Sequence, residues 1–386
     1  MSFLMNNYVR ADIAFVRGKG ARVIDDKGRE FIDFAAGIGV NSLGHANKAV
    51  VNAICEQSGK ILHSSNLYRI LPQERAAQKI SELLKRHTYT FFCNSGAEAN
   101  EAAIKLARKY GTENFKEKKY EILTLKNSFH GRTMATLKAT GQDKFHPDIF
   151  APYIDGFKFF DDIDEIISNI DEKTVAVMIE LIQGEGGIKP LEVDKVVKLA
   201  EVLKEKNLLL ITDEVQCGVY RTGAFATSQI YGITPDIITF AKGLAGGVAI
   251  GACVCDKDIF APGDHGSTFG GNFLATNTSL AVLNELENLQ KSGKLARRIS
   301  RFEKKLNKLV ELYPEIFEKR VGLGLMQGLV LKDANNLSKI YTNALKHRVL
   351  ILKSGTETLR FLPPLNIKKS DIKEGISRLC KALDEI

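Results

Sequence analysis

The middle of the chain alternates between short apolar segments and segments with helical periodicity. Stretches such as QERAAQKISELL at 73–84 have the helical pattern and lie between most of the apolar segments. Six apolar segments are each long enough for one strand, and they lie at 89–93, 120–125, 174–180, 208–212, 237–241 and 249–254. Strands that alternate with helices predict an α/β domain whose mainly parallel sheet is flanked by helices.

The two ends of the chain have a different pattern. Residues 15–34 alternate apolar and polar positions around turn signals, which predicts short antiparallel strands. After residue 272, a long charged amphipathic stretch is followed by strand-like pieces and a final amphipathic helix. We therefore expect residues 1–50 and 276–386 to pack together as a small α+β domain, and 51–275 to form the large domain.

Composition narrows the class of protein. A chain of 386 residues with 44% hydrophobic and 26% charged residues is typical of a globular protein with room for two domains. The six cysteines are scattered without the CxxC spacing of a zinc site, so we expect a reduced protein without a metal. The start, MSFLMNNYVR, does not resemble a signal peptide, and the longest uncharged apolar run, 244–255, is too short for a membrane span. These features predict a cytoplasmic protein with no membrane contact.

The net charge of +8 indicates either a nucleic-acid partner or a basic surface that attracts small anions. Lysines are mixed with acidic residues, as in the segments 116–121 and 303–311. This mixing is typical of solvated helix faces and not of a continuous basic stripe. We therefore expect no nucleic-acid partner.

The first candidate site is NSGAE at 94–98, which follows a predicted strand and begins a helix expected to end at Gly111. Ser95 and Glu98 have the spacing of a capping box, and Gly96 allows a ligand to approach the backbone. A helix start with free N–H groups binds phosphate well. A capped helix without a ligand is the alternative, and on this motif alone it is the better one.

The second candidate is the apolar segment LLLIT, which ends in Asp213, Glu214, Val215 and Gln216. Acidic residues at the carboxyl end of a sheet strand lie where α/β proteins bind ligands. The alternative, that Asp213 caps a turn, is about equally good from this segment alone.

The third candidate is Lys242 in DIITFAKGLAGG, a single lysine between an apolar strand and small residues. Burial there would lower the pKa of its ammonium and free the amine to attack an aldehyde. An ammonium that reaches out to water is the common alternative.

The three candidates together match pyridoxal phosphate, which needs a lysine for its aldehyde, an acid for its ring nitrogen and a helix start for its phosphate. At this point the chain resembles the fold-type I, class III pyridoxal-phosphate aminotransferases. The resemblance covers nearly the whole length, through motifs that include FFCNSGAEANEAAIKLARKY, NSFHGRTMATLKATG, IELIQGEGGI, LLITDEVQCGVYRTG, ITFAKGLAGG and GSTFGGN. Departures from the family pattern, LGHANKAV, GGNF and IELIQ in place of proline-containing forms, lie in turns and loops.

The resemblance implies roles for individual residues. Lys242 would bind the cofactor covalently, and Asp213 would pair with its ring nitrogen. Around the cofactor, Ser95, Gly96 and Ala97 would hold the phosphate, Phe129, Val215 and Gln216 would contact the ring, and Thr268 would reach the phosphate in the neighbouring subunit of an obligatory homodimer. Toward the substrate, the resemblance implies Arg132, Ser267 and Arg360 as binding residues, with Glu185 pairing with Arg360 when an amine-terminated substrate is bound.

The reaction implied by the resemblance is transfer of the δ-amino group of N2-acetyl-L-ornithine to 2-oxoglutarate by a ping-pong scheme. N-succinyl-diaminopimelate, ornithine, 4-aminobutyrate and diaminobutyrate remain alternative amine substrates. Two alternatives of another kind are a non-catalytic cofactor-binding scaffold, which Lys242 and Asp213 together argue against, and an aminomutase, which would need no 2-oxoglutarate.

Overall fold

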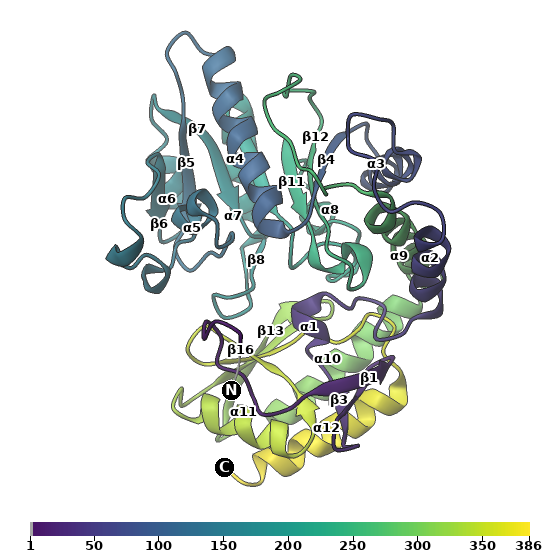
Figure 1. Ribbon diagram of the computed structural model, residues 1–386. Helices are drawn as coiled ribbons and strands as arrows, with labels where there is room; N and C mark the ends of the chain where they lie inside the picture. Colours follow the sequence, from purple (N-terminus) through teal and green to yellow (C-terminus); the bar gives the residue numbers. More distant parts are fainter. Residues whose placement is uncertain (1–2) are drawn as a thin grey trace.

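The computed structural model describes residues 3–386, and its centre is one seven-stranded sheet (Figure 1). Six of the seven strands run in the same direction, and only β12 runs against them, antiparallel to both of its neighbours. In spatial order the strands are β4 (Tyr89–Cys93), β12 (Gly251–Cys255), β11 (Ile237–Phe240), β10 (Leu209–Asp213), β7 (Thr174–Ile179), β5 (Glu121–Leu125) and β6 (Phe157–Phe160). The mainly parallel sheet expected from the sequence is confirmed, although β6, a short edge strand, was not predicted.

Helices cover both faces of this sheet because successive strand residues point to opposite sides. Met178 packs on the face covered by α4 (Gly96–Glu113) and α5 (Met134–Ala139). Its neighbour Val177 packs on the other face, which is covered by α6 (Ile163–Ser168), α7 (Val193–Glu205) and α8 (Thr227–Tyr231). The sheet is therefore buried on both faces, as its nearly continuous apolar strands require.

One helix boundary differs from the expectation. Helix α4 does not end at Gly111 but continues to Glu113, and Gly111 is buried within it. A Cβ atom at Gly111 would lie only 2.0 Å from the carbonyl oxygen of Lys119. The glycine is needed for close packing against the following loop, not for ending the helix.

Both ends of the chain contribute to one small sheet, in which β3 pairs in parallel with β15. Its order is β1 (Phe15–Lys19), β2 (Arg22–Asp25), β3 (Glu30–Asp33) and β15 (Val349–Leu350). A second small sheet contains β13 (Phe317–Leu323), β14 (Met326–Leu331), β17 (Thr358–Phe361) and β16 (Leu352–Ser354). Helices α10 (Lys294–Leu312), α11 (Asn336–Lys346) and α12 (Lys369–Leu383) lie beside these sheets (Figure 1). The domain boundaries at 50 and 275 stay a prediction.

The remaining elements connect these parts. Helices α2 (Lys48–Ser58) and α3 (Leu71–Leu84) both pack on α9 (Phe273–Lys291). The shorter elements are α1 (Ala36–Gly39), η1 (Asp143–Phe145), η2 (Asp148–Phe150), η3 (Lys242–Ala245), β8 (Ile182–Gln183) and β9 (Lys189–Pro190). Within residues 3–386, no helix combines the length and the apolar content needed to cross a membrane.

Candidate active site

A cavity of about 410 Å³ lies where β10 and β11 end and α4 begins. This is the edge of an α/β sheet at which ligands bind, and the volume suits a small aromatic ligand. Nine of the residues selected from the sequence line it: Ser95, Gly96, Ala97, Phe129, Arg132, Asp213, Val215, Gln216 and Lys242. Segments distant in the sequence thus meet at one site.

Lys242 is the first residue of η3 and lies two residues after the end of β11. Its φ of +39° is rare for a residue with a side chain, and strained backbone of this kind is often found at functional sites. The side chain is partly exposed toward the cavity. Burial lowers the pKa of its ammonium below the ordinary value, and the opposing charges of Asp213 and Glu185 do not outweigh that effect. The amine is therefore more available as a nucleophile than an exposed lysine would be.

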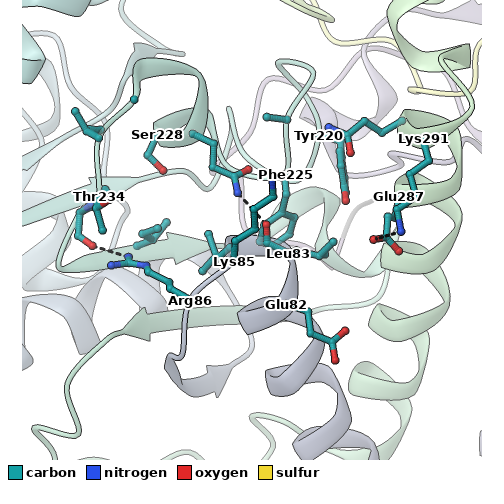
Figure 2. Close-up of a pocket in the computed structure, with 18 residues that line it drawn as sticks. Glu82, Leu83, Lys85, Arg86, Tyr220, Phe225, Ser228, Thr234, Glu287 and Lys291 are labelled. Carbon is teal, nitrogen blue, oxygen red and sulfur yellow. Dashed lines mark hydrogen bonds and ion pairs between the residues drawn. The ribbon is translucent and has the colours of Figure 1, made fainter.

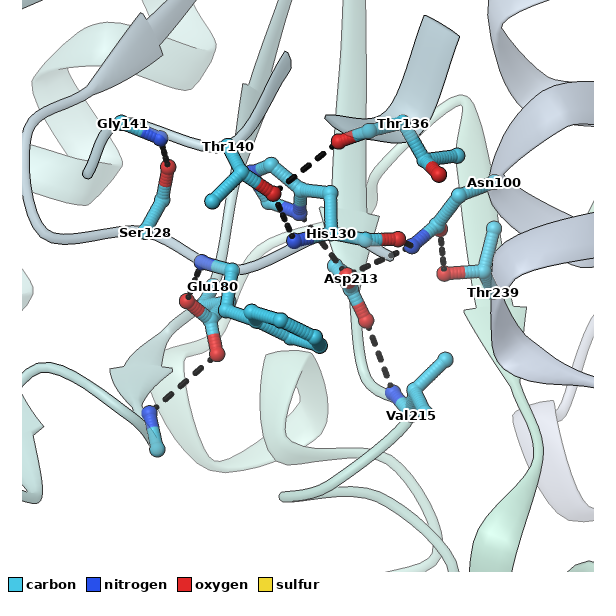
Figure 3. Close-up of polar contacts among 12 residues, drawn as sticks. Asn100, Ser128, His130, Thr136, Thr140, Gly141, Glu180, Asp213, Val215 and Thr239 are labelled. Atoms are coloured by element: carbon cyan, nitrogen blue, oxygen red, sulfur yellow. Dashed lines mark hydrogen bonds and ion pairs between the residues drawn. The ribbon is translucent and has the colours of Figure 1, made fainter. Parts of the chain in front are cut away.

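Asp213 is the last residue of β10, and its buried carboxyl group is held by three donors (Figure 3). The backbone N–H of Val215 donates to Oδ1 at 3.0 Å. The side chains of His130 and Asn100 contact Oδ2 at 2.8 and 2.7 Å. The turn-capping alternative accounts only for the Val215 contact, whereas the two side-chain contacts fix the carboxyl group at the wall of the cavity.

His130 is a residue of this site that the sequence analysis did not select. Its Nδ1 faces Asp213, while its buried Nε2 has no hydrogen-bond partner within residues 3–386. Because a carboxylate can only accept, Nδ1 carries a hydrogen and donates it to Asp213. The residue lies next to Phe129 in the motif FHGRT, so the motif pointed to the segment but not to this contact.

The start of α4 forms one half of the capping box that the sequence spacing predicts, because the Glu98 carboxyl group accepts from the backbone N–H of Asn94 and not from that of Ser95. The Ser95 hydroxyl accepts a hydrogen bond from the backbone N–H of Glu98 at 3.2 Å. Gly96 also meets a packing requirement, because a Cβ atom there would lie 2.6 Å from Cγ1 of Val215, while its role in ligand approach stays a prediction. The glycine thus lets the helix start pack directly against the segment that follows Asp213. Ser95, Gly96 and Ala97 line the cavity at this helix start, where the helix carries a partial positive charge.

Aromatic and cationic groups lie at the mouth of the cavity. Arg132 is exposed, and its guanidinium group lies 5.6 Å from the ring centre of Phe129 and 4.1 Å from that of Phe145. Cation–π contacts of this kind hold the arginine near the opening without neutralising its charge. The charge remains available for an anionic group.

Arg360 and Glu185 form an ion pair at the side of the site. Arg360, on β17, is buried, and its Nη1 also donates to the carbonyl oxygen of Gly184 at 2.9 Å and to Oε1 of Gln216 at 3.1 Å. Burial alone would raise the pKa of Glu185, but the charge and hydrogen bond of Arg360 outweigh it, so the pKa is lowered. The Arg360 Nε atom is buried without a partner within residues 3–386 and can bind a further acceptor.

Glu180 is a second site residue that was not selected from the sequence, although it is the second residue of the motif IELIQGEGG. Its carboxyl group accepts hydrogen bonds from the backbone N–H groups of Phe129 at 2.9 Å and Gly184 at 3.2 Å (Figure 3). Burial and the nearby charge of Asp213 raise its pKa to about 7. The residue connects the Phe129 loop to the loop that carries Glu185.

Ser267 and Thr268 lie on the loop before α9, outside the lining of the cavity as the described residues define it. The Ser267 hydroxyl contacts Nδ2 of Asn94 at 3.2 Å, beside the start of α4. Thr268 is exposed. Their binding roles stay predictions.

A second cavity, of about 580 Å³, lies between α3, α8 and α9 (Figure 2). Mixed charges line it, among them Glu82, Arg86 and Glu287. None of the residues selected from the sequence lines it, and it has neither the lysine nor the helix start of the first cavity. The chemistry therefore belongs to the first cavity.

The residues present fit pyridoxal phosphate. One cavity brings together an accessible amine at Lys242, a buried carboxyl group at Asp213 and the start of α4. Fold and site together define a pyridoxal-phosphate enzyme of the aminotransferase type. The chain matches the family described as Aminotransferase class-III over residues 4–383, and it belongs to that family.

Proteins with similar sequences include several acetylornithine aminotransferases. An acetylornithine aminotransferase from Wolinella succinogenes is 51% identical, covering 100% of this chain and 98% of that protein. One from Methanocaldococcus jannaschii is 45% identical, with coverage of 98% and 94%.

Solved structures agree on the fold. N-acetylornithine aminotransferase from Stenotrophomonas maltophilia is 34% identical with a TM-score of 0.83, covering 97% of this chain and 96% of that one. Ornithine aminotransferase from Toxoplasma gondii is 28% identical with a TM-score of 0.92, covering 99% and 93%. The expected family, fold and cofactor are thereby confirmed.

Proposed function

We propose that the protein transfers the δ-amino group of N2-acetyl-L-ornithine to 2-oxoglutarate, giving N-acetyl-L-glutamate 5-semialdehyde and L-glutamate, a step of arginine biosynthesis. The relatives of that name at 45–51% identity support this substrate. The observation that carries the proposal is the Arg360–Glu185 ion pair beside Gln216. This ion pair offers the Arg360 guanidinium, which 2-oxoglutarate needs for its α-carboxylate and which N-acetylornithine does not need.

The two substrates make opposite demands on this pair. Glutamate and 2-oxoglutarate carry an α-carboxylate beside the reacting carbon, and a guanidinium fork binds such a group well. N-acetylornithine presents a terminal amine on an apolar chain, which an unpaired buried cation would disfavour. With Glu185 bound to Arg360 the site accepts the amine, and with Glu185 displaced it accepts the carboxylate. Arg132 at the mouth would bind the distal carboxylate of either substrate.

The proton transfers follow from the positions of Lys242 and Asp213. Bound pyridoxal phosphate supplies an aldehyde that joins covalently to amines and a ring that withdraws electrons from the reacting carbon. Lys242 Nζ would hold the cofactor through its aldehyde, and the same amine would serve as the base that moves the proton at the substrate δ-carbon. The Asp213 carboxylate would stabilise the protonated ring nitrogen throughout.

The experiment that tests the substrate compares kcat/KM for N-acetylornithine, N-succinyl-diaminopimelate, ornithine and 4-aminobutyrate at saturating 2-oxoglutarate. We expect N-acetylornithine to give the highest kcat/KM, and a higher kcat/KM for another amine would make that amine the proposed substrate. Turnover without 2-oxoglutarate would indicate an aminomutase. Absence of amino transfer with all four amines would favour the non-catalytic alternative.

We further propose a cytoplasmic homodimer in which Thr268 of each subunit contacts the cofactor phosphate of the other. The exposure of Thr268 supports this role, and six free cysteines support a reducing compartment. Mixed dimers of Lys242→Ala and Thr268→Ala subunits test the sharing. One site per mixed dimer would contain both native residues, so mixing should restore cofactor retention that the Thr268→Ala dimer lacks. If dimers that have demonstrably exchanged subunits do not regain cofactor retention, the proposed sharing of Thr268 is contradicted.

A further inference from the structure

A buried chain of hydrogen bonds runs behind the cavity from Thr239 through Asn100 to Asp213 (Figure 3). The Thr239 hydroxyl, on β11, lies 2.7 Å from Oδ1 of Asn100, on α4. Asn100 Nδ2 lies 2.7 Å from Oδ2 of Asp213 and 2.7 Å from the carbonyl oxygen of His130. The exposed fractions of Thr239 and Asn100 are 0% and 1%, so water does not compete for these contacts.

The direction of these hydrogen bonds is fixed by what each group can offer. A carboxylate and a carbonyl oxygen can only accept, so the amide nitrogen of Asn100 must face Asp213 and His130. Its amide oxygen then faces Thr239, whose hydroxyl donates. A flipped amide would place an oxygen against two other oxygens and leave its NH₂ group facing a single hydroxyl. The Thr239 hydroxyl therefore fixes which end of Asn100 meets the carboxylate.

We propose that Asn100 and Thr239 are positioning residues that hold the Asp213 carboxylate toward the cofactor's ring nitrogen. Asn100 and His130 hold Oδ2, and the Val215 N–H holds Oδ1, so the plane of the carboxyl group is fixed from three sides. Thr239 is not among the described residues that line the cavity, and it acts only through Asn100. The inference rests on the assignment of the cavity to pyridoxal phosphate but not on the choice of amine substrate.

A purely structural role is the alternative, because the same contacts join α4, β10 and β11. The positioning role and the structural role differ in one respect. Only positioning of the Asp213 carboxylate requires a nitrogen in the cofactor ring. A cofactor analogue with a C–H group in place of the ring nitrogen, 1-deazapyridoxal phosphate, has no group for Asp213 to bind. A structural defect would weaken retention of cofactor and analogue equally, whereas a positioning defect would weaken retention of the cofactor only.

The experiment measures the rate at which each ligand leaves the reconstituted enzyme in the presence of a trap. Thr239→Val removes the hydroxyl at constant shape, and we expect about a tenfold faster loss of pyridoxal phosphate because one hydrogen bond to a charged group is weakened. Loss of the deaza analogue should change less than about twofold. Thr239→Ser keeps the hydroxyl and should restore the wild-type rate for both ligands.

Thr212→Val is the matched control. Thr212 is equally buried on β10, beside Asp213 in sequence, but its hydroxyl has no hydrogen-bond partner within residues 3–386. We expect it to retain both ligands at wild-type rates. If Thr239→Val does not fold, Asn100→Ala serves in its place with the same expected difference between ligands. Equal acceleration for cofactor and analogue, or none for either, overturns the proposal, while a wild-type protein that binds no pyridoxal phosphate overturns the function as well.

Discussion

The two sides of the site are built differently. On the cofactor side, the buried Asp213 carboxyl group is held by the backbone N–H of Val215 and by the buried side chains of Asn100 and His130. On the substrate side, Arg360 is held mainly by one charged partner, Glu185, whose side chain is 29% exposed. Several buried contacts favour a single arrangement, whereas an ion pair with a partly exposed partner allows two. The difference fits a cofactor that stays bound and two substrates that alternate.

The largest effect is expected at Lys242, the residue proposed to bind the cofactor covalently. Lys242→Ala removes both the attachment point and the base, so we expect turnover to fall on the order of 10⁴-fold or more. Steady-state assays with N-acetylornithine and 2-oxoglutarate measure it. Lys369→Ala, at an exposed lysine on α12, is the control and should turn over normally. Wild-type turnover in Lys242→Ala would remove the lysine from the mechanism.

Asp213→Asn tests whether the fixed carboxylate acts through its charge. The shape is kept, but stabilisation of the ring nitrogen is lost, so kcat should fall roughly 10²- to 10³-fold. Both half-reactions, followed separately by stopped-flow absorbance, should slow together because both use the same ring. Slowing of only one half-reaction would contradict a shared role.

Glu185→Gln should affect the two half-reactions in opposite directions. Arg360 loses its charged partner, so we expect kcat/KM for N-acetylornithine to fall about tenfold while that for glutamate is unchanged or higher. Arg360→Lys, which loses the planar fork, is the complementary variant and should weaken glutamate instead. Parallel losses for both substrates in Glu185→Gln would mean that the pair is structural.

The smallest expected effect concerns the free energy of unfolding. Burial raises the pKa of Glu214, next to Asp213, to about 7, and backbone N–H groups of Thr227 and Ser228 only partly offset it. Because the pKa of Glu214 is higher in the folded protein than in the unfolded chain, its contribution to the free energy of unfolding is complete below the unfolded-state pKa. That contribution is lost as the pH rises through 7. Relative to Glu214→Gln, the wild type should therefore lose roughly 2 kcal/mol between pH 5 and pH 8 in urea denaturation. A constant difference between the two proteins would contradict the raised pKa.

Sequence patterns could predict the chemistry that lies at strand ends. Lys242, Asp213 and Ser95 each lie within two residues of the end of a recognisable apolar segment, so local pattern selected them, and their combination then favoured a ligand site over the alternatives. His130, Asn100 and Thr239 were missed because their partners are distant in the sequence and no local pattern specifies such contacts. For Gly96 the sequence indicated close approach but not that Val215 is the neighbour. The role proposed for Thr268 requires a second chain, and no single-chain pattern describes such a contact.

The parallel pairing of β3 with β15 also constrains how the protein is made. Ile32 pairs with Val349, so one edge of β3 has no partner until nearly the whole polypeptide has left the ribosome. An unpaired strand edge invites pairing with another molecule, and contacts between distant parts of a chain form slowly. Stalled or truncated translation products of this enzyme should therefore aggregate through their amino-terminal strands, and folding of this sheet should be a late, post-translational event.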